Sequence, residues 1–375
     1  MINFVKSLFI DMRNRIDKMK TYLELLSVVS PVSSEFKNKT VEALIALKSE
    51  IDGTITSGIL NVDIFLRNNL IKYNSIHNTF LEIELFRFLP IIKYGQAEEY
   101  FEKLIYKIYA EIQCLQSVPF ISTISNSESY YWAYPKYNMI ALPNGEEKNL
   151  LNLSDLYHEI GHLLFQQSKQ FLIGNHFVNI SQHFKDEKQR LRDEGNPDSF
   201  INEIEKGETF WVDTWTEEFT CDLIATYLVG PAYAWTNMKL CTISSSYNAI
   251  YSDGNMFREH PPDEARMRVI FKMLESTGFN AELAEIESTW NKFLIKTQNS
   301  KPHHYQFIFP NIMIDSITQN VLTGCNNIGL QRYSEQVKNL AQPVSLSINE
   351  AWSNIRNAPD SFGLWESSTL DTLIK

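Results

Sequence analysis

Apolar residues in the first 115 positions recur at three- and four-residue steps, which is the period of an α-helix. The first apolar stripe consists of Val5, Leu8, Met12, Ile16, Met19, Leu23 and Leu26. This helix is expected to end at Ser30-Pro31, because the residue before a proline is pushed out of helical geometry. Similar stripes predict further helices over about 36–53, 59–73, 77–91 and 96–115.

The pattern changes between about 118 and 143. Short aromatic and β-branched segments, separated by Asn, Ser and Pro, predict a few antiparallel strands there. Helical periodicity then returns, and it predicts helices over about 152–172, 177–193, 197–206, 214–229, 263–277, 280–296, 311–323 and 345–357. The expected fold is therefore mainly α with a small antiparallel β element (α+β). We expect a helical N-terminal region over 1–115, a central domain over 116–300 and a helical C-terminal region over 301–375 that packs on the core.

Composition and charge exclude several classes of protein. The 375 residues are 44% hydrophobic and 21% charged, as in ordinary globular chains. The net charge is −11, and no basic stripe accompanies it, so we expect no nucleic-acid partner. The four cysteines are far apart and form no CxxC pair, which argues against a disulfide scaffold and suits a reducing cytoplasm. A cytoplasmic location is the prediction.

The N-terminal apolar run is too short for a membrane or export segment. Asp11 and Arg13 interrupt it, and no small-residue cleavage site follows. The sequence also has no stretch of about 18 uninterrupted apolar residues. We therefore expect no signal peptide and no integral membrane segment.

The residues that point to chemistry are His158, Glu159 and His162, in the pentapeptide His-Glu-Ile-Gly-His. Two histidines at positions i and i+4 lie on the same helix face and can bind one divalent ion from adjacent turns. Glu159 is rotated away from them, where its carboxylate can reach a metal-bound water rather than the metal. The alternative is a chance pair of core histidines, and the pentapeptide arises by chance in on the order of one chain in a hundred.

A third ligand is expected on a second helix. The residues after His162, LLFQQSKQF, lack the glycine and histidine that a metzincin needs. The predicted helix around 215–230 instead carries Glu218 and Asp222, which are four residues apart and share a face. Asp222 lies among apolar residues and needs a partner, for which the ring N–H of a metal-bound histidine is suitable. Glu218 then becomes the third ligand, with Glu217 as an alternative because the helix phase is uncertain.

His-Glu-Ile-Gly-His followed by Glu218 and Asp222 resembles the gluzincin branch of zinc metallopeptidases, whose signature is HExxH with a downstream ExxxD. The resemblance implies one Zn²⁺ per chain on His158, His162 and Glu218, with Glu159 as general base. It also implies that Asp222 is hydrogen-bonded behind the first histidine. The central domain would then be a zincin-like catalytic core, preceded by the helical region.

A further element begins at His260-Pro261 and includes Arg266. It is similar to the His-Pro followed by Arg in the membrane-embedded zinc peptidases related to CAAX-processing enzymes. The resemblance implies that His260 or Arg266 helps to polarise the scissile carbonyl or to hold the oxyanion. The alternatives are a surface-loop histidine and a structural arginine paired with a carboxylate. Tyr251, in the loop before them, is a further candidate for the donor role.

These features predict a zinc-dependent metallopeptidase that hydrolyses peptide or protein substrates with a zinc-bound water activated by Glu159. An endopeptidase is favoured, because the GxMEN segment of gluzincin aminopeptidases is absent. One alternative is a catalytically idle zincin-fold protein that acts as a binding or regulatory module, although the intact Glu159 argues against it. Another is a zinc hydrolase acting on a non-peptide amide. We hypothesise that the N-terminal helices cover the cleft or recruit a partner protein.

Overall fold

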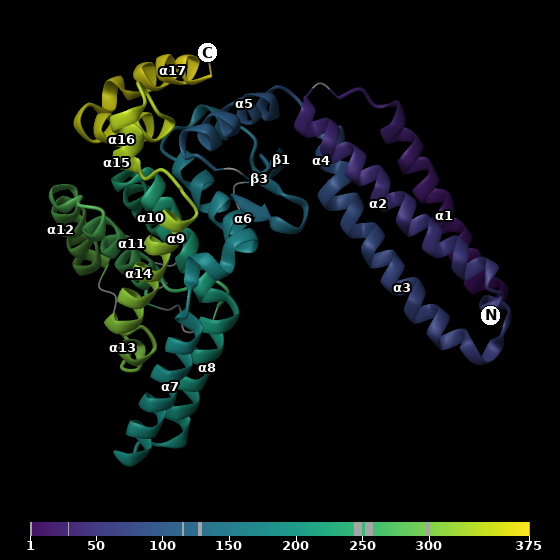
Figure 1. Ribbon diagram of the computed structural model, residues 1–375, viewed down its shortest axis with the longest axis horizontal. Coiled ribbons are helices and arrows are strands. Elements are labelled where there is room, and N and C mark those ends of the chain that lie inside the picture. The colour runs from purple at the N-terminus through teal and green to yellow at the C-terminus, as the bar shows by residue number, and fades with distance from the viewer. Residues whose placement is uncertain are drawn as a thin grey trace. The chain divides into compact units, whose positions relative to one another are not determined.

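The computed structural model describes residues 2–28, 30–114, 116–126, 130–243, 250–251, 258–297 and 301–374. This part of the chain is mostly helical, with one small mixed sheet of three strands (Figure 1). The prediction of a mainly α fold with a small β element is confirmed. No helix within these ranges combines the length and the apolar character that a membrane crossing requires.

The sheet consists of β1 (Phe120–Ser125), β2 (Trp132–Tyr134) and β3 (Met139–Pro143), in the order β1–β3–β2. Strands β1 and β3 are parallel, with Phe120 opposite Met139 and Ile121 opposite Ile140. The prediction of an antiparallel element is therefore wrong for this pair. Alternation of side chains marks a strand but carries no information about its direction, and the chain passes through β2 before β3 lies beside β1.

The chain divides into two compact units. The first comprises 1–102, 118–130 and 136–144, and the second comprises 103–117, 131–135 and 145–375. Each unit is defined by contacts among its own residues and not by an ability to fold independently. The expected division of the chain into domains at 115 and 300 stays a prediction.

The first unit is built on three long helices that run alongside one another (Figure 1). Its helices are α1 (Ile2–Leu25), α2 (Pro31–Thr56), α3 (Leu66–Ile83), a π-helical turn (Glu84–Phe88), α4 (Leu89–Lys93) and the first part of α5 (Gln96–Glu111). Ser30 caps α2, because its hydroxyl accepts a hydrogen bond from the Ser33 backbone N–H and Pro31 occupies the first turn. The predicted break at Ser30-Pro31 is confirmed.

The secondary structure of the second unit, over the residues that the structure describes, consists of helices and the strand β2. Its helices after α5 are α6 (Leu153–Ile173), α7 (His176–Asp193), α8 (Asp198–Phe210), a π-helical turn (Trp211–Trp215), α9 (Thr216–Val229), α10 (Pro231–Ile243), α11 (Asp263–Ser276), α12 (Asn280–Thr297), α13 (Tyr305–Ile308), α14 (Asn311–Asn327), α15 (Tyr333–Asn339), α16 (Val344–Asn357) and α17 (Phe362–Leu373). Gly230 adopts a φ of 69°, which L-residues rarely tolerate, and it ends α9 just before Pro231 begins α10.

Helices α6 and α9 form the centre of the second unit and pack closely against each other. Nearly every side chain of α9 is buried. The two backbones approach each other closely at Gly161, where a Cβ atom would lie 2.9 Å from the Cα of Cys221. Glycine at this position therefore allows the two helices that carry the predicted site to lie side by side.

Candidate metal centre

Helices α6 and α9 bring the predicted site residues together. His158 and His162 lie on α6. Potential ligand atoms of His158, His162 and Cys221 lie within 4.8 Å of one another, with His158 and Cys221 buried and His162 partly exposed. This group could bind a metal ion. The sequence had indicated no ligand role for Cys221, since a buried thiol is usual in a helical core.

The carboxylate of Glu218 faces both histidines. Its Oε2 lies 3.6 Å from His158 Nε2, and its Oε1 lies 3.6 Å from His162 Nε2. Within the part of the chain that the structure describes, the buried Oε2 has no hydrogen-bond partner. The distances resemble the separation of about 3.4 Å between neighbouring ligands of a tetrahedral zinc ion whose bonds are about 2.1 Å. These donor atoms therefore fit a small cation.

A carboxylate lies behind each histidine. His158 Nδ1 is 3.0 Å from Asp222 Oδ1, and His162 Nδ1 is 2.9 Å from Glu217 Oε1. Each imidazole thus turns Nδ1 toward an acceptor and Nε2 toward Glu218. Asp222 lies behind His158, as the sequence led us to expect, and Glu217 lies behind His162, on the Nδ1 side of the ring. This arrangement favours Glu218 over Glu217 as the third ligand, a role that stays a prediction.

The electrostatics favour Glu218 over Cys221 as an ionised donor. Burial raises the pKa of the Cys221 thiol well above its ordinary value. Burial alone would also raise the pKa of Glu218, but its interactions with His158, His260 and His162 outweigh burial and hold it well below its usual range. Burial alone would lower the pKa of the His158 imidazole, and the neighbouring carboxylates oppose that change. The nearby carboxylates of Asp222 and Glu218 raise this pKa to about 10.

Arg266, on α11, pairs with Asp222. Its Nε donates to Oδ2 over 2.8 Å and its Nη2 donates to Oδ1 over 2.6 Å. Asp222 is fully buried, and burial alone would raise its pKa, but Arg266 and His158 hold that pKa well below its usual range. The Nε and Nη2 donors of the guanidinium are both engaged in this pair. The structural alternative left open for Arg266 is therefore favoured over a role at the oxyanion.

Tyr233, near the start of α10, is a member of the site that the sequence analysis missed. Its hydroxyl lies 2.5 Å from Asp222 Oδ1 and 3.0 Å from His158 Nδ1. Its ring is nearly parallel to that of His158, with an angle of 13° between the planes. The Gly230-Pro231 turn brings this residue back against α9. A tyrosine just after such a turn, whose hydroxyl needs a partner when buried, was the available signal.

Glu159 is buried on α6, with 6% of its surface exposed. It accepts a hydrogen bond from the backbone of Ala133, in β2. Burial raises the pKa of the Glu159 carboxyl, and the neighbouring charges of His158 and His162 oppose that rise. A carboxylate whose pKa is raised in this way is suited to accept a proton and then release it.

His260 lies at the rim of this group. Its Nε2 is 3.6 Å from Glu218 Oε2, while 65% of its side chain is exposed. The structure thus brings His260 to the predicted site and leaves much of its ring accessible. Tyr251, the other candidate donor, packs edge-on against Tyr305 of α13.

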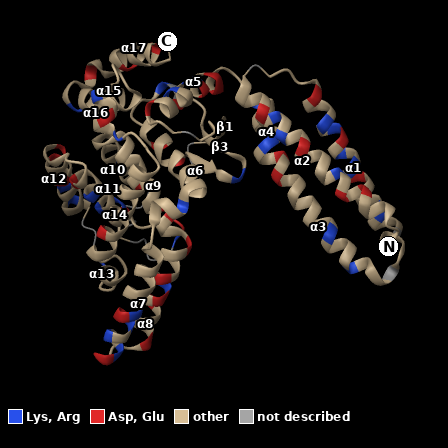
Figure 2. Ribbon diagram, viewed as in Figure 1, with Lys and Arg blue, Asp and Glu red and all other residues tan. Residues whose placement is uncertain are grey.

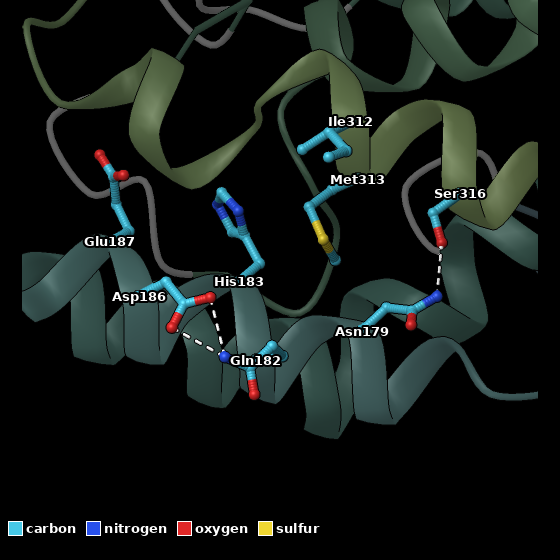
Figure 3. A pocket seen from close by; sticks show the side chains of 8 residues that line it. All are labelled: Asn179, Gln182, His183, Asp186, Glu187, Ile312, Met313 and Ser316. Atoms are coloured by element: carbon cyan, nitrogen blue, oxygen red, sulfur yellow. Dashed lines mark hydrogen bonds between the residues drawn. The ribbon is translucent and has the colours of Figure 1, made fainter. Parts of the chain in front are cut away.

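A groove of about 390 Å³ lies between α7 and α14 (Figure 3). It is lined by Asn179, Gln182, His183, Asp186, Glu187, Ile312, Met313 and Ser316, none of which belongs to the predicted site. Figure 2 shows acidic and basic residues interspersed along the ribbon of α7 and α8. The expectation of no nucleic-acid partner stays a prediction.

No protein-family model, curated protein or solved structure matches the chain. A function therefore has to be argued from the residues of the centre themselves.

Proposed function

We propose that this protein is a zinc-dependent metallopeptidase of the gluzincin type, with a zincin-like catalytic core. His158, His162 and Glu218 would hold one Zn²⁺. The observation that carries the proposal is the convergence of two imidazole Nε2 atoms on the Glu218 carboxylate at 3.6 Å, each imidazole being held from behind by a second carboxylate. Two imidazoles and one carboxylate are a usual donor set for catalytic zinc.

The charge balance supports a divalent cation at this position. Glu159, Glu218 and Asp222 are three acidic groups with little exposed surface, and in the described part of the chain Arg266 is the one arginine or lysine that pairs with them. The two histidines of the centre are neutral when they bind a metal, so they add no positive charge in that state. Buried carboxylates are costly unless they are paired or bind a metal. A divalent ion between the two histidines and Glu218 would supply the missing positive charge.

When bound, zinc would lower the pKa of a coordinated water towards about 7 and polarise the peptide carbonyl. Glu159 would accept the proton of the attacking water on its carboxylate and pass it to the leaving amine nitrogen as the C–N bond breaks. His260, accessible at the rim, would donate a hydrogen bond to the oxyanion that develops on the carbonyl oxygen. We further propose that peptide or protein chains are the substrates and that cleavage is internal.

The test is the variant Glu159→Gln, which keeps the shape of the side chain and removes its basicity. We expect it to retain zinc and to hydrolyse a mixed peptide library at least about 100-fold more slowly than the wild type, as detected by mass spectrometry. Glu205→Gln, an exposed position on α8, is the matched control and should remain active. Equal hydrolysis by wild type and Glu159→Gln, both with zinc bound, would overturn the mechanism. No hydrolysis by the zinc-loaded wild type would favour the idle binding module instead.

A further inference from the structure

Tyr233 lies within a buried group of polar side chains behind His158. Its hydroxyl is within hydrogen-bond distance of both His158 Nδ1 and Asp222 Oδ1, at 3.0 and 2.5 Å. Asp222 is fully buried, and Tyr233 has 1% of its surface exposed. Solvent therefore has little access to these hydrogen bonds.

The direction of the hydrogen bonds follows from Asp222. Two hydrogen bonds from Arg266 hold this carboxylate in its ionised form, in which it can only accept. The Tyr233 hydroxyl must then donate to Asp222, and its phenolic oxygen can accept from His158 Nδ1–H, as can Asp222 Oδ1 at the same distance of 3.0 Å. The proton of a neutral His158 consequently resides on Nδ1, and the lone pair of Nε2 faces Glu218.

We propose that Tyr233 is a positioning residue that fixes the tautomer and the ring plane of His158 and thereby sets the affinity of the centre for its metal ion. The hydroxyl supplies an acceptor for Nδ1–H beside an Asp222 oxygen that Arg266 already engages. The two ring planes are 13° apart, so the hydroxyl lies close to the plane of the imidazole, where a hydrogen bond from Nδ1–H holds the ring orientation. The inference rests on the metal site of the proposed function but not on its hydrolytic activity.

The experiment compares Tyr233→Phe with wild type by zinc competition against a chromogenic chelator. Removal of a hydrogen bond behind a metal-bound histidine should weaken zinc binding about 10-fold or more. The ring that remains should keep the metal-free protein folded, with a single cooperative melting transition and a modest loss of stability from the buried hydroxyl. The absorption bands of the cobalt-substituted protein should also shift. Tyr227→Phe is the matched control, because its buried hydroxyl bonds to Asn326 and the Leu330 carbonyl instead. It should bind zinc within about twofold of wild type.

A Tyr233→Phe protein with wild-type zinc affinity and an unchanged cobalt spectrum would overturn the proposal. If that variant does not fold, ¹H NMR spectra of the zinc-loaded wild type decide. A slowly exchanging Tyr233 hydroxyl proton with a cross-peak to His158 Nδ1–H supports the proposal, and a Tyr233 hydroxyl proton in rapid exchange with solvent overturns it. Wild-type protein that binds no zinc would overturn both this inference and the proposed function. A third outcome is that the zinc-loaded wild type hydrolyses nothing while Tyr233→Phe binds zinc more weakly. This result would overturn the proposed peptidase activity and support the role of Tyr233.

Discussion

Glu217 and Glu218 are neighbours in the chain but face different atoms of the two histidines. Glu218 lies 3.6 Å from both Nε2 atoms, whereas Glu217 lies 2.9 Å from Nδ1 of His162. We therefore expect Glu218→Gln to lose nearly all zinc, and Glu217→Gln to bind it only about 10-fold more weakly. The two variants remove the same charge from adjacent positions, so each controls for the other. A larger loss of zinc in Glu217→Gln would reverse the assignment of the ligand.

His176 gives a prediction about the dependence of stability on pH. The residue is fully buried on α7, and burial lowers its pKa from 6.5 to about 4. Below about pH 6.5 the unfolded chain therefore binds a proton that the folded protein does not, and stability falls as the pH falls toward about 4. The full effect would be on the order of 3 kcal/mol in the free energy of unfolding.

The measurement is urea unfolding at several pH values between 6.5 and 4. The loss of stability on acidification should be smaller in His176→Phe than in wild type, whatever the absolute stability of the variant. Ser316→Ala removes the neighbour that lies 3.4 Å from His176 Nδ1 and keeps the histidine, so it should retain the wild-type dependence. Equal pH dependence in wild type and His176→Phe would show that another group dominates.

Sequence reasoning identified residues whose chemistry is local and did not identify those whose partners are distant. His158 and His162 share a helix face by their spacing alone, and Asp222 stood out as an acidic residue among apolar ones. The position of Tyr233 just after the Gly230-Pro231 turn was a weaker signal, because it does not identify the partners that the hydroxyl meets when α10 folds back beside α6 and α9. Arg266 was left with two possible roles, and its hydrogen bonds to Asp222 distinguish them.

At the level of elements, the contact between α6 and α9 depends on Gly161. A Cβ atom there would lie 2.9 Å from Cys221 Cα, and backbone cannot move aside as a flexible side chain can. Gly161→Ala should therefore destabilise the protein by about 1–3 kcal/mol and weaken zinc binding, although alanine favours helices. Gly363→Ala in α17, where a Cβ would meet nothing within 4 Å, should be neutral or stabilising. Equal melting temperatures for Gly161→Ala and wild type would contradict this view of the helix contact.

The elements themselves were predicted better than their irregularities. The helix predicted over 263–277 appears as α11, from Asp263 to Ser276. The helix predicted over 214–229 begins instead with the last residues of a π-helical turn, Trp211–Trp215, before α9. Such a turn changes the helix phase by one residue, and apolar periodicity does not reveal it. This is one reason why Glu217 and Glu218 could not be separated from the sequence.

At the scale of the whole molecule, the two compact units are assembled from alternating segments of the chain. Residues 103–117 belong with 145–375, while 118–130 and 136–144 belong with 1–102. Hydrophobic periodicity identifies a helix and its apolar face, but not the distant segment against which that face packs. The sequence therefore suggested contiguous parts, and the alternation between units had no local signal.

This alternation determines how the hypothesis about the N-terminal helices has to be tested. The segment 103–117 is tied to the C-terminal helices, because Glu111 accepts a hydrogen bond from Val344 N–H and the Ile112 carbonyl accepts one from Gln331 N–H. Its fully buried side chains are Leu104, Ile105, Ile108 and Ile112. Their loss would remove roughly 8 kcal/mol of burial free energy, which is comparable with the total stability of about 5–15 kcal/mol of ordinary proteins.

We therefore expect a chain of residues 116–375 to be unfolded and a chain of 103–375 to unfold cooperatively in urea and to retain zinc. Deletion of residues 1–115 would abolish activity whether or not the N-terminal helices recruit a partner, because it also removes part of the core of the second unit. Deletion of 1–102 removes the helices and leaves that segment in place. Equal unfolding midpoints for the two truncated chains would contradict the assignment of 103–117 to the second unit. If the midpoints differ, the chain 103–375 is the one to use for the hypothesis about the N-terminal helices. A loss of partner binding or of specificity in that chain can then be attributed to the absence of α1–α4.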